Sequence, residues 1–430
     1  MKWIESTIGE SCLVGDGAHA KIKRQDSGIL YLTSKNFKNG QLDLSKVDYI
    51  SEEDYKKYFR LDSKALTKPQ TNDIVFSIIG TIGEPYLCQV KDFFGISSSV
   101  SILRPNQKNI YPKYLYYWLQ GYLFQNALYG IKGGVAQSYV SLEMIKSLPL
   151  YYPPLPTQQK IAGILSAYDD LIENNTRRIE ILEEMARMLY REWFVKFRFP
   201  DHEAVQFVES ELGLIPEGWE VKKLKEFIEI KHGYAFKGEF FSKDPTSNIL
   251  LTPGNFKFGG GFKWDKLKYY DGEMPSDFIL KNGDLIVTMT DLSKLGDTLG
   301  YPALVPPSKD LKFLHNQRIG KVNFKNQKLG LFYLYYLLCS DSYRSHVLGT
   351  ATGSTVKHTA PDRIKDFSFI LPESDILNQF EKIADSIIHQ TVNLESKNIN
   401  LRKTRDLLLP RLISGEIDVE NLAINTGIQP

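Results

Sequence analysis

The chain is poor in cysteine and in long apolar runs. Its 3 cysteines, Cys12, Cys88 and Cys339, are scattered and share no metal-ligand spacing. This pattern argues against a disulfide framework and a zinc site, and it favours a reduced cytoplasmic compartment. The longest apolar run, residues 331–339, is far too short to span a bilayer, and the N-terminus has no apolar signal core. We therefore expect a cytoplasmic protein that does not enter the membrane.

Signatures of catalysis are also missing. The sequence has no phosphate-binding G-x-x-x-x-G-K-[ST] loop, no H-E-x-x-H, no G-x-S-x-G and no Cys-x-x-Cys pair. Its 7 histidines are dispersed, and a structural role is the better interpretation of each. We therefore expect a non-catalytic protein that holds no metal and no cofactor of its own.

The net charge neither requires nor excludes nucleic acid. The 53 lysines and arginines nearly balance the 51 aspartates and glutamates, which leaves a formal charge of +2. The distribution of basic residues must therefore decide whether the chain binds nucleic acid. A length of 430 residues allows two or three domains, each with its own core.

The most regular stretch begins after the proline-rich residues 151–156. One seven-residue ladder contains Ile161, Tyr168, Asn175, Leu182 and Leu189, and a second contains Leu165, Ile172, Ile179, Ala186 and Trp193. Two adjacent ladders of this period form an apolar seam, which indicates coiled-coil packing. About 36 residues can continue as one helix for ~54 Å, so the seam needs a partner. A third ladder supplies it with Phe380, Ile387, Leu394, Leu401 and Leu408.

The segments on either side of the central helix repeat each other. Thr33, Asn36, Phe37 and Lys38 recur, at one constant offset in the numbering, as Thr252, Asn255, Phe256 and Lys257. YLYYWL at Tyr114 recurs as YLYYLL at Tyr333 with the same offset, whereas the offset between Asp73 and Asp284 is smaller. Fixed anchors with variable loops between them indicate one scaffold that carries two different surfaces. In the first copy we expect strands at residues 29–37, 73–80 and 98–103, and a helix at 111–128.

The sequence thus predicts an α+β fold with two repeated globular α/β domains separated by two long helices. We expect the helices to pack as an antiparallel coiled coil and the copies to be pseudo-two-fold symmetric, one at each end. The expected segments are a globular domain at 1–154, a central helix at 155–198, a linker and second globular domain at 199–373, and a C-terminal helix and tail at 374–430. Asn175, a polar residue in the seam, is interpreted as a device that fixes helix register.

Basic, polar and aromatic side chains gather in equivalent loops of both copies. Lysines can neutralise phosphates, while polar side chains on a loop can reach base edges in the major groove. The competing interpretation is that these side chains form a solvated hairpin face with no binding role. Their recurrence at equivalent places in both copies favours contact with DNA. The candidate DNA-contacting residues are Lys21, Lys23, Arg24, Lys35, Asn36, Lys38, Lys132, Gln137, Ser138, Tyr139, Asn255, Lys257, Lys263, Lys266, Ser354, Thr355, Lys357 and His358.

The long motif PLPTQQKIAGILSAYDDLIENNTRRIEILEEMARMLYREWFVKFRFP is followed by LGLIPEGWE, and LLLPRLISGEIDV lies near the C-terminus. Over nearly its whole length, the chain closely resembles the specificity subunits of type I restriction-modification systems. The resemblance implies two target-recognition domains that each read one half of a bipartite DNA target. It also implies that the helices set the spacer between the half-sites.

The partners implied by this resemblance are double-stranded DNA, two methyltransferase subunits and the restriction subunits. The methyltransferase subunits would carry S-adenosylmethionine and methylate adenine, and the restriction subunit would use ATP, so this chain would need neither cofactor. Contacts with the methyltransferase subunits are implied near the helix ends, at Trp193, Phe194, Phe197, Phe199, Leu408, Leu409, Arg411 and Leu412. We expect Lys257 to bind phosphate in any sequence, and Gln137 to affect one half-site alone.

Three other interpretations stay open at this point. The chain could serve another DNA-modification defence system, such as a methyltransferase that lacks a conventional nuclease, which its neighbouring subunits would reveal. It could be a two-lobed scaffold or carbohydrate-binding protein, which would lack salt-sensitive DNA binding. An enzyme with an unrecognised site is the third.

Overall fold

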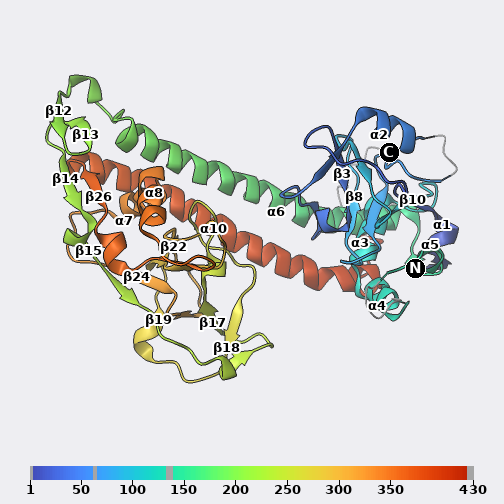
Figure 1. Ribbon diagram of the computed structural model, residues 1–430. Helices are drawn as coiled ribbons and strands as arrows, with labels where there is room; N and C mark the ends of the chain where they lie inside the picture. Colours follow the sequence, from blue (N-terminus) through green and yellow to red (C-terminus); the bar gives the residue numbers. More distant parts are fainter. Residues whose placement is uncertain (1–2, 62–64, 132–138, 424–430) are drawn as a thin grey trace. The chain divides into compact units, whose positions relative to one another are not determined.

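The computed structural model describes residues 3–61, 65–131 and 139–423. The chain forms two compact units, which are described separately. Unit 1 contains Met1–Asn174 and Asn398–Pro430, and unit 2 contains Asn175–Lys397. The long helix α6 (Leu155–Tyr190) starts in unit 1 and ends in unit 2, and α10 (Ser374–Ile413) runs from unit 2 into unit 1 (Figure 1). Each unit therefore has a globular part and a piece of both long helices.

The globular part of unit 1 is built on a four-stranded antiparallel sheet with the order β2-β10-β7-β8. A second sheet has the order β6-β3-β9, in which β3 and β9 are parallel. The elements are β1 (Ile4–Thr7), α1 (Ile8–Ser11), β2 (Cys12–Asp16), β3 (Ile29–Leu32), η1 (Ser34–Asn36), β4 (Phe37–Lys38), β5 (Gln41–Leu42), β6 (Asp48–Ile50), α2 (Glu52–Tyr58), β7 (Ile74–Ser77), β8 (Pro85–Leu87), β9 (Phe94–Ile96), β10 (Val100–Pro105), α3 (Pro112–Gln120), α4 (Tyr122–Ile131), α5 (Leu142–Lys146) and β11 (Pro149–Tyr152).

Unit 2 repeats this plan. Its four-stranded sheet has the order β15-β24-β20-β22, and its other main sheet has the order β16-β18-β17-β23-β19, with β17 parallel to β23. The elements are η2 (Arg191–Val195), η3 (His202–Ala204), β12 (Phe207–Ser210), β13 (Gly213–Pro216), β14 (Glu220–Lys223), η4 (Leu224–Glu226), β15 (Ile228–His232), η5 (Gly238–Phe240), β16 (Phe241–Ser242), β17 (Asn248–Leu251), η6 (Pro253–Asn255), β18 (Lys268–Tyr270), η7 (Ser276–Phe278), β19 (Ile279–Leu280), β20 (Leu285–Thr288), β21 (Thr290–Asp291), β22 (Pro302–Leu304), β23 (Lys312–His315), β24 (Ile319–Phe324), α7 (Leu331–Leu337), α8 (Asp341–Thr350), β25 (Lys357–His358), α9 (Pro361–Lys365) and β26 (Ser368–Leu371).

The residues that anchor the sequence repeat make the same contacts in both units. The hydroxyl of Tyr114 donates to the carbonyl of Tyr151, and the hydroxyl of Tyr333 donates to the carbonyl of Ile370. Donor and acceptor are displaced by the same offset as the other anchors of the repeat. Each bond attaches a helix to the strand that precedes a long helix, so the repeat in the sequence is a repeat of structural contacts.

The two long helices run antiparallel within each unit. In unit 1, Arg405 pairs with Asp169, and Nδ2 of Asn398 donates to the carbonyl of Ile172 at 3.4 Å. A later position on α6 thus contacts an earlier position on α10, which shows that the two helices run in opposite directions. In unit 2 the rings of Trp193 and Phe380 lie 6.2 Å apart. This confirms the expected helical ladders and antiparallel coiled coil. Asn175 is buried in the seam, as its place in the ladder predicts.

The prediction of a single helix at residues 111–128 is wrong in one respect. The segment forms two helices, α3 and α4, which are divided at Gly121. A Cβ atom at Gly121 would lie 2.0 Å from Cδ1 of Ile413 in α10. The chain bends where α10 packs against it, so a tertiary contact overrides a continuous helical pattern.

Each long helix also caps a helix of the globular part beside it. In unit 1 the side chain of Gln158 in α6 accepts a hydrogen bond from the backbone N–H of Tyr111 at 2.8 Å, just before α3. In unit 2 the carboxylate of Glu381 in α10 accepts one from the N–H of Tyr333 in α7 at 2.7 Å. Backbone N–H groups at a helix start need such partners. Burial raises the pKa of Glu381, although these bonds favour its charged form.

Candidate nucleic-acid interface

Residues 256–263 of unit 2 form a hairpin with several basic and aromatic side chains. Three consecutive glycines form its turn. Gly259, Gly260 and Gly261 have φ angles of 78°, 92° and 111°, a region that residues with a Cβ rarely adopt. A Cβ at Gly260 would lie 2.5 Å from Sγ of Cys339, and the N–H of Gly261 donates to the carbonyl of Pro302 at 2.9 Å. This hairpin turn is therefore held against the globular core of unit 2.

Lys257, at the start of this turn, lies beside the long helices. Its Nζ atom is 3.2 Å from Oε1 of Glu183 in α6. The carboxyl of Glu395 in α10 also interacts with both groups: burial raises its pKa, the Lys257 charge lowers it, and the Glu183 charge raises it. The structure thus gives Lys257 a partner inside unit 2, whereas the sequence predicts a phosphate contact.

The glycine-rich loop after α8 is closed as a small polar hairpin. The backbones of Thr352 and His358 bond each other, with N–O distances of 2.9 Å and 2.8 Å. Ser354, Thr355 and His358 are exposed, and Lys357 is half-buried. Strand β25 pairs with β21, and Nδ1 of His358 lies 3.1 Å from the hydroxyl of Thr290. The predicted residues 354–358 therefore gather on one exposed loop, beside the segment that follows β20.

Unit 1 has a backbone pairing in the corresponding position. Tyr139, which is 48% exposed, pairs through its backbone with Ile79, just after β7. The pairing of Thr290 with His358 in unit 2 is its counterpart, because β20 corresponds to β7 in the sheet order. The other predicted residues near Tyr139 in the sequence, Lys132, Gln137 and Ser138, lie outside the described residues.

The remaining basic residues lie on the surface. Lys21, Lys23 and Lys35 are exposed in unit 1, and Lys263 and Lys266 are exposed in unit 2. Three of the predicted residues have acidic neighbours, which are Asp48 for Arg24, Asp43 for Lys38 and Asp265 for Lys263. Exposed pairs of this kind are worth less than about 1 kcal/mol, so phosphates can compete for these cations.

Asn36 and Asn255 have a structural role in place of the predicted DNA contact. Both are buried, and each side-chain oxygen accepts hydrogen bonds from the N–H and hydroxyl of the threonine three residues earlier. Their amide groups donate to loop carbonyls at 2.9 Å from Asn36 to Asp43 and 3.3 Å from Asn255 to Lys263. A buried amide with these partners cannot reach a base edge.

A loop that the sequence analysis missed lies beside the polar hairpin of unit 2. Leu292 and Leu295 are 67% and 79% exposed, although their loop is firmly held. The carboxylate of Asp291 accepts from the N–H of Ser293 at 2.6 Å and from the hydroxyl of Thr298 at 2.7 Å. Burial opposes ionisation of Asp291, but these bonds outweigh it and lower the pKa. The offset of the repeat grows between β20 and α7, which marks an insertion in this region and is the signal that could have located the loop.

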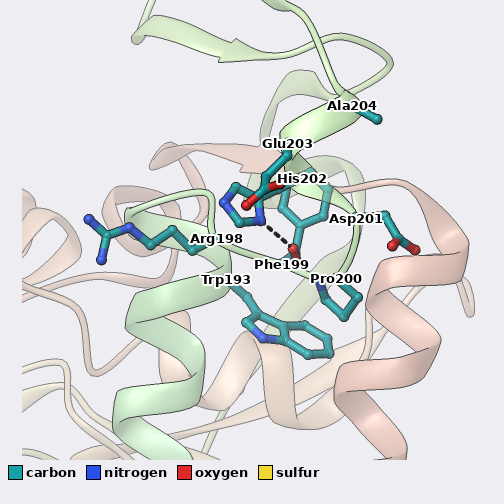
Figure 2. Close-up of a pocket in the computed structure, with 8 residues that line it drawn as sticks. All are labelled: Trp193, Arg198, Phe199, Pro200, Asp201, His202, Glu203 and Ala204. Carbon is teal, nitrogen blue, oxygen red and sulfur yellow. Dashed lines mark hydrogen bonds between the residues drawn. The ribbon is translucent and has the colours of Figure 1, made fainter.

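Half of the predicted partner-binding residues are buried core residues. Trp193, Phe194, Phe199 and Leu412 are buried, Phe197, Leu408 and Leu409 are half-buried, and Arg411 alone is exposed. Figure 2 shows the residues around Trp193. They line a cavity of about 550 Å³. It is lined by Trp193, Arg198, Phe199, Pro200, Asp201, His202, Glu203 and Ala204, with Nδ1 of His202 2.8 Å from the carbonyl of Phe199. The buried aromatic rings lie beneath this surface, so any partner would meet its polar residues Arg198, Asp201, His202 and Glu203.

Among the described residues, no cluster of three or more histidine, cysteine, aspartate or glutamate side chains could hold a metal ion. None of the helices in the described ranges is long and apolar enough to cross a membrane. The three cysteines are free thiols, and burial raises the pKa of Cys12 and Cys339 to about 12. Such thiols are poor nucleophiles at neutral pH.

Comparison with known proteins identifies the family. The family model for the type I restriction modification DNA specificity domain matches twice, at residues 2–184 and 216–401. The MjaVIII specificity subunit of Methanocaldococcus jannaschii is 26% identical over 386 residues, which cover 87% of this chain and 86% of that protein. The MjaIX specificity subunit of the same organism is 27% identical over 332 residues, which cover 73% of this chain and 72% of that protein.

A solved structure shares the fold. The type I restriction-modification S subunit from M. genitalium aligns over 96% of both chains with a TM-score of 0.56 and 15% sequence identity. The alignment includes both globular parts and both long helices, as the coverage requires. The chain belongs to the family of type I restriction-modification DNA specificity domains and is a non-catalytic, DNA-recognition subunit.

Proposed function

We propose that this chain reads a bipartite DNA target with two target-recognition domains, residues 1–154 and 199–373, one for each half-site. The helical segments 155–198 and 374–430 set the spacer between the half-sites. They also dock two methyltransferase subunits, which act with restriction subunits on the same DNA. The proposed location is the cytoplasm, where the cell's DNA is reached directly.

The observation that carries this proposal is the equivalent loop pair in the two units. In each unit, the segment after a central strand of the four-stranded sheet pairs with the loop after the second short helix, at Ile79 with Tyr139 and at Thr290 with His358. The paired segments differ in sequence, and the segment after the central strand is longer in unit 2, while the framework beneath them is shared. Two loop surfaces on one scaffold suit the reading of two different half-sites.

The chemistry of these loops suits DNA. Exposed hydroxyl and imidazole groups at Ser354, Thr355 and His358 can exchange hydrogen bonds with base edges. The nearby exposed lysines can neutralise phosphates, which would fix the domain on the duplex. The proposed contacts in unit 1 are Lys21, Lys23, Arg24, Lys35, Lys38 and Tyr139, and in unit 2 they are Lys263, Lys266, Ser354, Thr355, Lys357 and His358.

The test is to co-express the tagged chain with its methyltransferase subunits, map the methylated adenines, and measure binding to the resulting target. The proposal predicts a bipartite motif and an affinity that falls steeply as salt rises, with a slope of about −0.9 per phosphate contact. A complex that binds no DNA, or that binds a single undivided motif, would contradict it.

A further inference from the structure

The globular part of unit 2 shares one apolar core with the long helices, and two polar contacts lie at separate places along this attachment. One is the cap that Glu381 of α10 provides for α7, through the N–H groups of Phe332 and Tyr333. The other is the ion pair between Lys257 and Glu183, beside Glu395. Residues 381 and 395 lie ~21 Å apart along α10 at 1.5 Å per residue. Glu183 lies just before Ala186, the first buried residue of α6 in that core, so the ion pair restrains the globular part at the margin of the apolar contact.

The second of these contacts, the Lys257–Glu183 ion pair, is an interaction between charged side chains. Burial raises the pKa of Glu395 on α10, and the like charge of Glu183 on α6 raises it further. Lys257 offsets this repulsion from the globular side. Its Nζ and the Glu183 carboxylate belong to side chains that are only 38% and 28% exposed, so solvent screens this interaction less than it screens a surface pair. Lys257 thus links the hairpin around residues 259–261 to α6.

Unit 1 has a different ion pair at the equivalent position on its helices. When α6 is aligned with α10 so that Leu165 matches Ile387, Glu183 occupies the position of Arg405, and Thr391 occupies that of Asp169. Arg405 and Asp169 form an ion pair between the two helices, so both charges come from the helices themselves. The hydroxyl of Tyr117 then donates to Asp169 at 2.5 Å. Lys38, the counterpart of Lys257, pairs with Asp43 in its own hairpin.

We propose that Lys257 is a positioning residue: by its ion pair with Glu183, it fixes the orientation of the second recognition domain on the helices and so determines which spacer length the DNA target must have. This inference rests on the proposed function. It assigns Lys257 to spacer selectivity in place of phosphate binding. A residue that only binds phosphate would act alike on every DNA, whereas a residue that holds the domain acts through the distance between half-sites.

The test compares DNA targets with the mapped spacer, with spacers one base pair shorter and longer, and with random sequence, all bound by the complete methyltransferase complex. We expect Lys257→Met to reduce the preference for the mapped spacer by about fivefold, the size of a partly exposed ion pair. Affinity for random DNA should stay unchanged. Glu183→Gln, which breaks the same pair from the helix side, should have the same effect, and Lys257→Glu with Glu183→Lys should restore the preference.

Lys263→Met is the matched control. Lys263 belongs to the same hairpin and pairs with Asp265 on the surface at 3.0 Å. Its loss should weaken binding to all DNA without changing spacer preference. The role of Lys257 is overturned if Lys257→Met weakens binding to all four DNAs equally, or if the charge exchange restores nothing. If the wild-type complex itself shows no preference for spacer length, the proposed function fails, whatever the variants show.

Discussion

Gly121 and Ile413 are in contact so close that a Cβ atom on the glycine would lie 2.0 Å from Cδ1 of the isoleucine. The backbone of Gly121 has an ordinary extended conformation, with φ −69° and ψ 149°, so the requirement for glycine is steric. We predict that Gly121→Ala destabilises the protein by about 1–3 kcal/mol, the usual cost of overpacking a core.

A double-mutant cycle tests this contact by urea unfolding. Ile413→Val removes Cδ1, and the next atom of that side chain, Cγ1, lies 3.5 Å from the same Cβ position. The double variant should therefore recover most of the stability that Gly121→Ala loses. Purely additive losses would show that another contact accounts for the glycine.

Asp169 is predicted to stabilise unit 1 because it receives two partners. It accepts the Tyr117 hydroxyl and pairs with Arg405, and both partners are partly buried. Burial raises the pKa of Tyr117, and the Asp169 charge raises it further. Asp169→Ala should cost about 1–3 kcal/mol because it leaves that hydroxyl without its acceptor. Glu52→Ala, which breaks an exposed pair with Lys56, should cost under about 1 kcal/mol; equal losses from the two changes would refute the role of burial.

His315 is predicted to make unit 2 sensitive to acid. It is buried, its Nε2 lies 2.9 Å from the carbonyl of Ile319, and Nδ1 has no hydrogen-bond partner among the described residues. Burial lowers its pKa to about 4 from 6.5, with smaller effects from Lys231 and Lys321. The unfolded chain therefore binds a proton near pH 6.5, while the folded chain resists it until about pH 4.

It follows that the stability of unit 2 falls as the pH drops through this window, by up to ~3 kcal/mol from His315. His315→Gln keeps a donor toward Ile319 but cannot be protonated, so it should lose less stability between pH 7.5 and pH 4.5 than the wild type. Urea unfolding at several pH values measures this difference. His389→Gln, at an exposed position on α10, serves as the control, and identical pH profiles for all three proteins would exclude the effect.

Asp291 is predicted to order the loop at residues 291–298. Asp291→Ala removes the acceptor for the backbone N–H groups of Ser293 and Thr298, so these amides should exchange hydrogen much faster. Asp297→Ala changes an exposed carboxylate of the same loop and should leave exchange unaltered. Unchanged protection in Asp291→Ala would mean that Arg344, which donates to the carbonyls of Gly296 and Leu299, holds the loop alone.

The sequence predicts the large features of this fold because they rest on periodic or repeated patterns. The apolar ladders locate α6 and α10, and the constant offset between the repeated anchors identifies two units with the same strand order. The break at Gly121 was not predictable, since its cause is the side chain of Ile413, which is far away along the chain. Local propensity does not record such contacts.

The candidate site was harder to predict, and Asn36 and Asn255 show why. Their recurrence in both copies favoured a DNA contact. However, two domains that recognise different half-sites share their structural framework and differ in the residues that contact bases. A residue common to both copies is therefore better interpreted as structural, as the buried turns at Asn36 and Asn255 demonstrate. The copy-specific loops, with Leu292 and Leu295 in unit 2, are where reading residues are expected.

The most direct test of the central claim is to map methylated adenines in cells that carry the complete complex with altered loops. Thr355→Ala with His358→Ala changes the loop of unit 2, and Tyr139→Ala changes the loop of unit 1. The account predicts that the first relaxes the sequence of one half-site, that the second relaxes the other, and that the spacer stays the same in both. Variants that both relax the same half-site, or that leave both half-sites intact, would contradict the assignment of one half-site to each domain.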